Sequence, residues 1–108
     1  ARLIQQNYSA QSNININKYI LDTNSRILRK SGNELKLTER EIDTILYLKK
    51  QNKPVKVNIL QKKVWKYGED LETHTVETHI YRLRKKIKNT FDDDSFIQSK
   101  KNGYTINE

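Results

Sequence analysis

The segment from Thr73 to Lys88 combines two chemically different faces if it forms a helix. At about 100° per residue, one narrow stripe that a helix would bury carries Val76, Ile80, Leu83 and Ile87. The opposite face carries small hydroxyls and long cations, namely His74, Thr75, Thr78, Tyr81, Arg82 and Lys85. Such a face fits the major groove of DNA, because the groove admits a helix, its phosphates attract cations, and Arg bridges the O6 and N7 acceptors of guanine. The alternative is the solvated face of an ordinary amphipathic helix.

The composition bounds the class of protein. With 108 residues, 34% of them hydrophobic, the chain can form one domain with one modest core. Its formal net charge of +8 favours an acidic polymer or surface as partner. No apolar run approaches the roughly 20 residues that span a bilayer, no signal-peptide core is visible, and the chain has no cysteine for disulfides or Cys-type zinc sites. We therefore expect a cytoplasmic protein with no membrane contact.

The N-terminal part of the chain predicts a tail followed by a small sheet. Residues 1–17 are rich in Asn, Gln and Ser without a sustained period, which is typical of a linker or tail. Between Lys18 and Leu37, short apolar clusters alternate with turn residues, which is most simply explained by three antiparallel strands. The folded domain is therefore expected over residues 18–108. The acidic triplet at 92–94 is expected to be a solvated loop.

Two helices are expected before Thr73. Thr38 and Glu41 have the spacing of a capping box, so a helix should begin there and end by about Asn52, before a proline. A second helix should run from about residue 57 or 58 to Gly68, and its inward side chains should be Leu60, Val64 and Trp65. Helix, turn, helix, connecting segment and the two-faced helix make a three-helix unit whose last member is free to enter a groove.

Lysines dominate the segment between Lys49 and Tyr67, which contains seven of them and no acidic residue. These side chains would be exposed in any globular protein, but the absence of compensating acids favours contact with phosphates. The candidates for such contacts are Lys56, Lys62 and Lys63.

The C-terminal residues predict a basic β-hairpin. Short apolar segments at 96–99 and 104–106 flank Lys100, Lys101, Asn102 and Gly103. The Asn-Gly pair predicts a type I′ turn, because both residues tolerate positive φ. A lysine-bearing hairpin beside a helix that binds DNA is a wing, which can reach the phosphate backbone or the adjacent minor groove.

This ordered set of residues resembles the winged helix-turn-helix effector domains of OmpR/PhoB-type two-component response regulators. The resemblance covers residues 18 to 107 and rests on Leu37, Thr38, Glu41, Val64, Trp65, Thr75, Val76, His79, Ile80, Leu83, Arg84, Lys86, Gly103 and Tyr104. It implies an α+β fold with an N-terminal four-stranded antiparallel sheet, a three-helix core and a C-terminal hairpin wing. It also implies a preceding receiver domain, with residues 1–17 as the connection to it, and a sensor kinase that acts only through that receiver.

The resemblance implies sequence-specific binding of double-stranded DNA and regulation of transcription. Its candidates on the third helix are His74, Thr75, Thr78, His79, Tyr81, Arg82, Arg84, Lys85 and Lys86, and those on the wing are Lys100 and Lys101. The loop formed by Lys66, Tyr67, Gly68, Glu69 and Asp70 corresponds to one through which some members contact RNA polymerase, although it could equally be a simple connector. The isolated domain should be a monomer that pairs head to tail on direct-repeat half-sites of a promoter.

Other functions fit the residues less well. The chain has no Gly-rich phosphate loop, no Cys nucleophile and no supported Ser-His-acid set, so we expect neither catalysis nor a cofactor. His74 and His79 lie on different sides of a helix, so no metal site is expected. A basic RNA-binding or ribosome-associated winged helix remains the alternative function. RNA-binding modules usually cluster exposed aromatics for base stacking, whereas most of the nine aromatics here (one Trp, six Tyr and two Phe) are dispersed.

Three further side chains each have a structural and a functional interpretation. Trp65 is better explained as a core anchor than as a platform for base stacking. His79 lies at the border of the two helix faces, so a packed imidazole competes with a phosphate contact. Arg84 lies on the flank near the core stripe, so it can serve a salt bridge or a phosphate.

Overall fold

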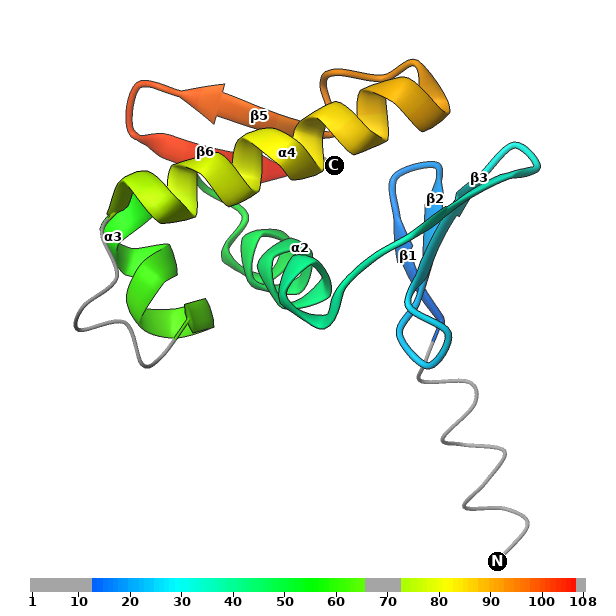
Figure 1. The fold of residues 1–108 in the computed structure, drawn as a ribbon, viewed down its shortest axis with the longest axis horizontal. Coiled ribbons are helices and arrows are strands. Elements are labelled where there is room, and N and C mark those ends of the chain that lie inside the picture. The colour runs from blue at the N-terminus through cyan, green and yellow to red at the C-terminus, as the bar shows by residue number, and fades with distance from the viewer. Residues whose placement is uncertain (1–12, 66–72, 107–108) are drawn as a thin grey trace, which may run out of the picture.

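Four short strands form an antiparallel sheet in the N-terminal part of the chain (Figure 1). The computed structural model describes residues 13–65 and 73–106. The strands pair in sequence order and are β1 (Asn13–Ile16), β2 (Tyr19–Asp22), β3 (Ile27–Lys30) and β4 (Asn33–Lys36). Ile14, Leu21, Leu28 and Leu35 lie opposite one another across the sheet, so one face is apolar and packs into the core.

Strand β1 lies in the segment that was predicted to be a tail. That prediction was wrong for Asn13–Ile16, and the sheet has the four strands that the resemblance implied rather than the three suggested by the apolar clusters. Two isoleucines separated by one asparagine are too few for a period to emerge in the sequence. Ile16 is fully buried only because β2 pairs with this segment and the helices cover it. The folded domain therefore includes residue 13, and residues 1–12 lie outside the described residues.

Helix α2 (Glu39–Gln51) begins and ends where the sequence predicted. The Glu41 backbone N–H donates to the Thr38 hydroxyl oxygen at 3.2 Å, and the Thr38 N–H donates to the Glu41 carboxylate at 2.8 Å. These two bonds confirm the capping box. At the other end Asn52 adopts a left-handed conformation with φ of 55°, and its N–H donates to the Leu48 carbonyl. The buried face carries Ile42, Ile45 and Leu48.

The second helix is composite. Helix α3 (Val57–Leu60) continues into a π-helical turn, η1 (Gln61–Trp65). Its start and its inward side chains are confirmed, because Leu60, Val64 and Trp65 are all buried. The predicted end at Gly68 lies outside the described residues.

The long helix α4 (Thr73–Phe91) runs across α2 with its N-terminal end beside α3 (Figure 1). It extends three residues beyond the predicted end at Lys88. The predicted core stripe is confirmed, because its four members are at most 1% exposed: Val76, Ile80, Leu83 and Ile87. The next residue, Asp92, has a φ of 56°, which stops the helix, and donates its N–H to the Lys88 carbonyl.

The C-terminal hairpin consists of β5 (Ile97–Lys100) and β6 (Gly103–Ile106), which we call the wing. The predicted Asn-Gly type I′ turn was wrong. The two turn residues are Lys101 and Asn102, neither of which has a positive φ, and Gly103 is the first residue of β6 with a φ of 134°. The glycine is needed for a close approach instead, since a Cβ at this position would lie 2.1 Å from the Val55 carbonyl oxygen.

The loop after α4 ties the helices to the N-terminal sheet. The Tyr19 hydroxyl donates to the Asp93 carboxylate at 2.6 Å, and the Tyr19 ring packs against Phe91 and Phe96. Asp93 also accepts from the backbone N–H and the hydroxyl of Ser95, each at 2.8 Å. The prediction of a solvated acidic loop was therefore wrong for Asp93, whose side chain is only 19% exposed.

The decrease of stability towards low pH should depend in part on the protonation of Asp93. Partial burial acts to raise the pKa of this carboxyl, but hydrogen bonds from Tyr19 and Ser95 outweigh it and lower the pKa. A lowered pKa contributes stability that is present above the unfolded-state value near pH 3.9 and is lost as the pH falls through the folded-state value. We expect Asp93→Asn to reduce the free energy of unfolding by about 1 to 2 kcal/mol at pH 7. The difference from wild type should shrink towards pH 3.

Urea denaturation at pH 7 and pH 3 measures this effect. Asp94→Asn removes an equal charge from an exposed neighbouring position and should leave stability within about 0.5 kcal/mol of wild type. An equal loss in both variants would assign the effect to net charge rather than to the Tyr19 contact.

Candidate nucleic-acid interface

The polar face of α4 is open along most of its length. His74, Arg82 and Lys85 are exposed, Tyr81 is 61% exposed, and Thr75 and Thr78 are half-buried. The Thr78 hydroxyl donates to the His74 carbonyl at 3.0 Å, which orients its methyl group away from that carbonyl. The structure therefore brings together on one helix face the six residues that the sequence placed there.

Two cations predicted to bind DNA are held by the domain itself. The Arg84 Nε atom donates to the Ile97 carbonyl at 3.0 Å and so ties α4 to the first residue of β5. The Lys86 Nζ atom lies 2.8 Å from a carboxylate oxygen of Glu41, the capping-box residue of α2. Both side chains sit on the flanks of α4 rather than on its open face. Their contacts set the position of α4 relative to the wing and to α2.

The structure is compatible with both interpretations of His79, a packed imidazole and a phosphate contact. The residue is exposed, yet its ring centre lies 5.6 Å from that of Trp65 at a tilt of 56°. Trp65 itself is only 8% exposed and has the Arg40 guanidinium carbon 5.8 Å from its ring centre, which supports the role of a core anchor. The His79 ring therefore lies against Trp65 while the residue keeps access to solvent.

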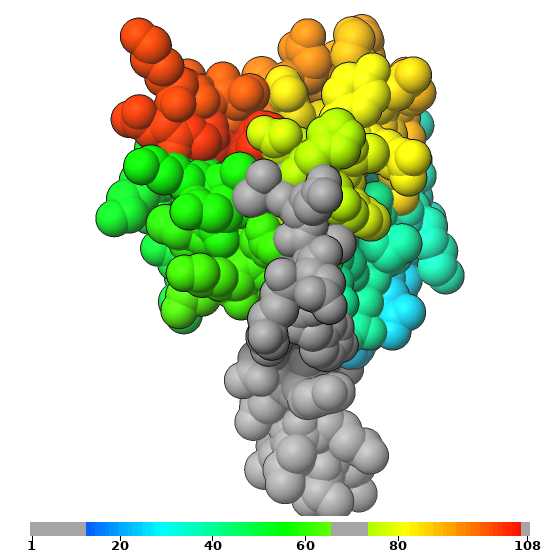
Figure 2. Space-filling view, turned by 60° about the vertical axis from the view of Figure 1, so that its left-hand side comes forward, coloured from blue at the N-terminus to red at the C-terminus, as the bar shows by residue number. Residues whose placement is uncertain are grey.

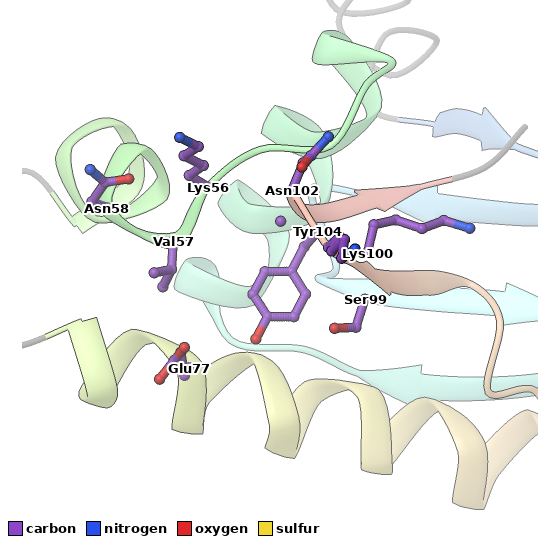
Figure 3. A pocket seen from close by; sticks show the side chains of 10 residues that line it. Lys56, Val57, Asn58, Glu77, Ser99, Lys100, Asn102 and Tyr104 are labelled. Carbon is purple, nitrogen blue, oxygen red and sulfur yellow. The ribbon is translucent and has the colours of Figure 1, made fainter.

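A groove separates α4 from the wing (Figure 3). We call it the wing groove. Its volume is about 530 Å³, and its lining residues are Lys56, Val57, Asn58, Glu77, Ser99, Lys100, Lys101, Asn102, Gly103 and Tyr104. Three of the five predicted phosphate-binding lysines outside α4 therefore line one groove, although more than 40 residues separate Lys56 from the other two in sequence. The backbone bridge between Val55 and Tyr104, with hydrogen bonds of 2.8 and 2.9 Å, brings them together.

The other two predicted phosphate-binding lysines, Lys62 and Lys63, lie apart from the wing groove. Both are exposed on η1, and Lys63 lines a shallow groove beside Asp43 and Tyr47 of α2. The space-filling view shows α4 in yellow adjoining the wing in orange and red and α3 in green (Figure 2). The exposed residues of these three elements thus belong to adjoining parts of one surface.

Glu77 is a residue of this surface that the sequence analysis missed. It lies on α4, lines the wing groove and faces the region of the Tyr104 ring (Figure 3). Burial raises the pKa of the Tyr104 phenol, the Glu77 carboxylate raises it further, and Arg84 opposes both. The helical period placed Glu77 between the core stripe and the open face, and only the docking of the wing shows which flank it occupies. The signal available in the sequence was that Glu77 is the one acidic residue in a helix rich in cations.

Three further predictions concern loops, metals and membranes. The proposed polymerase-contact loop at residues 66–70 lies outside the described residues. Within the described ranges, no group of His, Cys, Asp or Glu side chains has the arrangement of a metal site. None of the helices in those ranges is long and apolar enough to cross a bilayer.

Residues 32–106 match the protein family described as "Transcriptional regulatory protein, C terminal". The chain belongs to this family. Domains of the family bind DNA and regulate transcription and are not enzymes, so the predicted function class is confirmed. The α+β winged helix-turn-helix fold and the resemblance to OmpR/PhoB-type effector domains are confirmed with it.

Individual relatives support the assignment. The response regulator ArlR of Staphylococcus aureus is 33% identical over 99 residues, which are 86% of this chain and 43% of ArlR. The chain therefore spans less than half the length of that curated relative. The DNA-binding domain of Escherichia coli CadC superposes with a TM-score of 0.74 at 25% identity and covers 85% of this chain and 88% of that domain.

A third similar protein is a streptococcal one, described under the words "a novel family of redox sensors in the streptococci evolved from two-component response regulators". It superposes with a TM-score of 0.74 at 27% identity and covers 99% of this chain and 47% of that chain. The proteins that contain a domain similar to this chain are thus described in different ways, and the similar domain is the part that each of them has in common with this chain.

Proposed function

We propose that this domain is the output module of a two-component response regulator and binds double-stranded promoter DNA in a sequence-specific manner. The observation that carries the proposal is the open cationic face of α4 beside a groove that collects Lys56, Lys100 and Lys101. A helix in the major groove and a basic hairpin beside it can contact bases and backbone at the same time. The similarity to ArlR supports the response-regulator context.

The candidate residues divide into three roles. The proposed contacts to base edges and adjacent phosphates in the major groove are His74, Thr75, Thr78, Tyr81, Arg82 and Lys85. The proposed backbone contacts are His79, Lys56, Lys62, Lys63, Lys100 and Lys101. Arg84 and Lys86 hold α4 against β5 and α2, so we propose that they position the helix. A polymerase contact through residues 66–70, a receiver domain and a sensor kinase stay predictions.

Selection of bound duplexes from a random library tests the function. We expect an enriched sequence of several base pairs that competes far better than unrelated DNA. RNA hairpins and single strands of the same length should compete only as polyanions, with an affinity that falls steeply with salt. Preferential binding of an RNA class would instead favour the RNA-binding alternative.

The wing should neutralise phosphates in a salt-dependent manner. Lys100 and Lys101 are exposed at its tip, so replacing both by alanine should leave two DNA phosphates without a cation from the protein. The slope of log K against log salt should then flatten by about 0.9 for each phosphate that is no longer neutralised. Titrations at several salt concentrations measure the slope. The control is Lys18→Ala, a change at an exposed turn of the N-terminal sheet, which should leave the slope at the wild-type value. A wild-type slope in the Lys100→Ala, Lys101→Ala double variant would instead show that the wing does not contact the DNA.

Assembly should depend on DNA. The large exposed hydrophobic residues in the described part of the chain are Ile20, Ile59 and Tyr81, which lie on three different elements and form no dimerisation stripe. We expect a monomer in sedimentation experiments and paired binding only on direct repeats about 10 to 10.5 base pairs apart. Duplexes with half-site spacings varied by half turns test the second part. A stable dimer without DNA, or equal affinity at every spacing, would contradict this arrangement.

A further inference from the structure

Glu77 differs in charge from everything around it on α4. It is the only acidic residue among the 19 residues of this helix, which carries five lysines and arginines. The residue is exposed, and its carboxylate makes no hydrogen bond or ion pair with any residue that the structure describes. Other acids near the helices are engaged, as Glu41 is with Lys86. The lone carboxylate of Glu77 is therefore available to a ligand.

The position of Glu77 among cationic residues indicates that its carboxylate weakens the binding of a phosphate placed next to it. The wing groove is lined by Lys56, Lys100 and Lys101, whose positive charges attract a phosphate backbone, and Glu77 is the only acid among its lining residues. None of these lysines forms an ion pair with Glu77, so the carboxylate does not serve to hold them in place. A phosphate brought against the α4 side of the groove would meet like charge, and like charge across an interface suppresses incorrect docking.

The position of Glu77 along the helix also fits contact with a base edge. His74 lies three residues before Glu77 and Tyr81 lies four residues after it, so both are neighbours of Glu77 on the surface of α4. A carboxylate in the major groove accepts a hydrogen bond from the N4 amino group of cytosine. Guanine and thymine offer only acceptors in that groove, so the carboxylate would repel their edges.

We propose that Glu77 is a specificity-determining residue that accepts a hydrogen bond from the N4 amino group of a cytosine at the wing-side edge of the α4 contact. In other docking registers the same carboxylate faces phosphates and weakens binding. Glu77 thereby raises the ratio of specific to nonspecific affinity through both effects. This inference rests on the proposed placement of α4 in the major groove.

The test compares wild type and Glu77→Gln by selection from a random duplex library, followed by titration of selected and random duplexes. Gln is close in shape to Glu but pairs with N6 and N7 of adenine. At one position of the selected sequence, the preference should change from cytosine to adenine. The ratio of wild-type-site to random-DNA affinity should fall by about fivefold or more. Glu77→Ala should abolish the cytosine preference without gaining one for adenine.

Asp94→Asn is the matched control, since it removes one negative charge from an exposed residue beyond the C-terminal end of α4. It should raise affinity for selected and random duplexes by the same small factor. Unchanged base preferences in Glu77→Gln, or effects equal to those of Asp94→Asn, would overturn the inference and leave the proposed DNA-binding function standing. A wild-type domain that prefers no duplex sequence would overturn the proposed function and the inference together.

Discussion

Gly103→Ala should reduce the free energy of unfolding by about 3 kcal/mol or more. Gly103 has a φ of 134°, and an added Cβ would lie 2.1 Å from the oxygen and 2.3 Å from the carbon of the Val55 carbonyl. It would also lie 2.8 Å from the backbone nitrogen of Lys56. These neighbours are backbone atoms, which cannot rotate away as a flexible side chain can. The substitution should break both hydrogen bonds of the bridge between Val55 and Tyr104.

Loss of this backbone bridge should also weaken DNA binding, because the bridge holds Lys56 beside the wing. Urea or thermal denaturation measures the stability, and DNA titration below the unfolding transition measures the affinity. The matched control is Gly32→Ala. Gly32 has a φ of 85° but no atom within 4 Å of an added Cβ, so its cost should be only about 1 kcal/mol from the backbone conformation. Equal costs at the two positions would show that contact with Val55 is not the cause.

Arg82→Ala should weaken specific binding by about 1 to 3 kcal/mol and nonspecific binding by much less. Arg82 is exposed on the open face of α4 and has no ion pair with a described residue. The substitution removes the guanidinium that would bind guanine O6 and N7 in a bidentate manner, so the preference at one position should relax. Titration of a selected duplex and a random duplex at one salt concentration measures the two reductions in affinity.

Arg82→Lys is the sharper companion variant. Lysine keeps the positive charge but lacks the planar fork, so nonspecific affinity should persist while the preference at the same position declines. A uniform reduction on both duplexes in Arg82→Ala, with full recovery in Arg82→Lys, would reassign Arg82 to a phosphate contact.

The sequence by itself determined those features that depend on neighbours along the chain. The core stripe of α4 follows from the helical period, and the start of α2 follows from the spacing of Thr38 and Glu41. The open face of α4 is the complement of its core stripe and was determined by the same period. Each of these features needs only a few consecutive residues to specify it.

Contacts between distant segments were decided by the tertiary structure alone. Strand β1 exists because β2 pairs with it, and Gly103 is required by the approach of Val55, nearly 50 residues earlier. Hydrophobic periods describe which face of an element is buried, but they do not specify the rotation and distance at which two elements dock. That docking directs Arg84 to the Ile97 carbonyl and Lys86 to Glu41.

The wing groove is the clearest case of this division. Lysines at 56, 100 and 101 were predicted to bind phosphates from charge alone, while their meeting place depends on the bridge between Val55 and Tyr104. The same bridge sets the wing against one flank of α4 and so gives Glu77 its position in the groove. Charge and period are properties of single segments, whereas a site formed by three segments requires the long-range backbone contacts that only the folded chain contains.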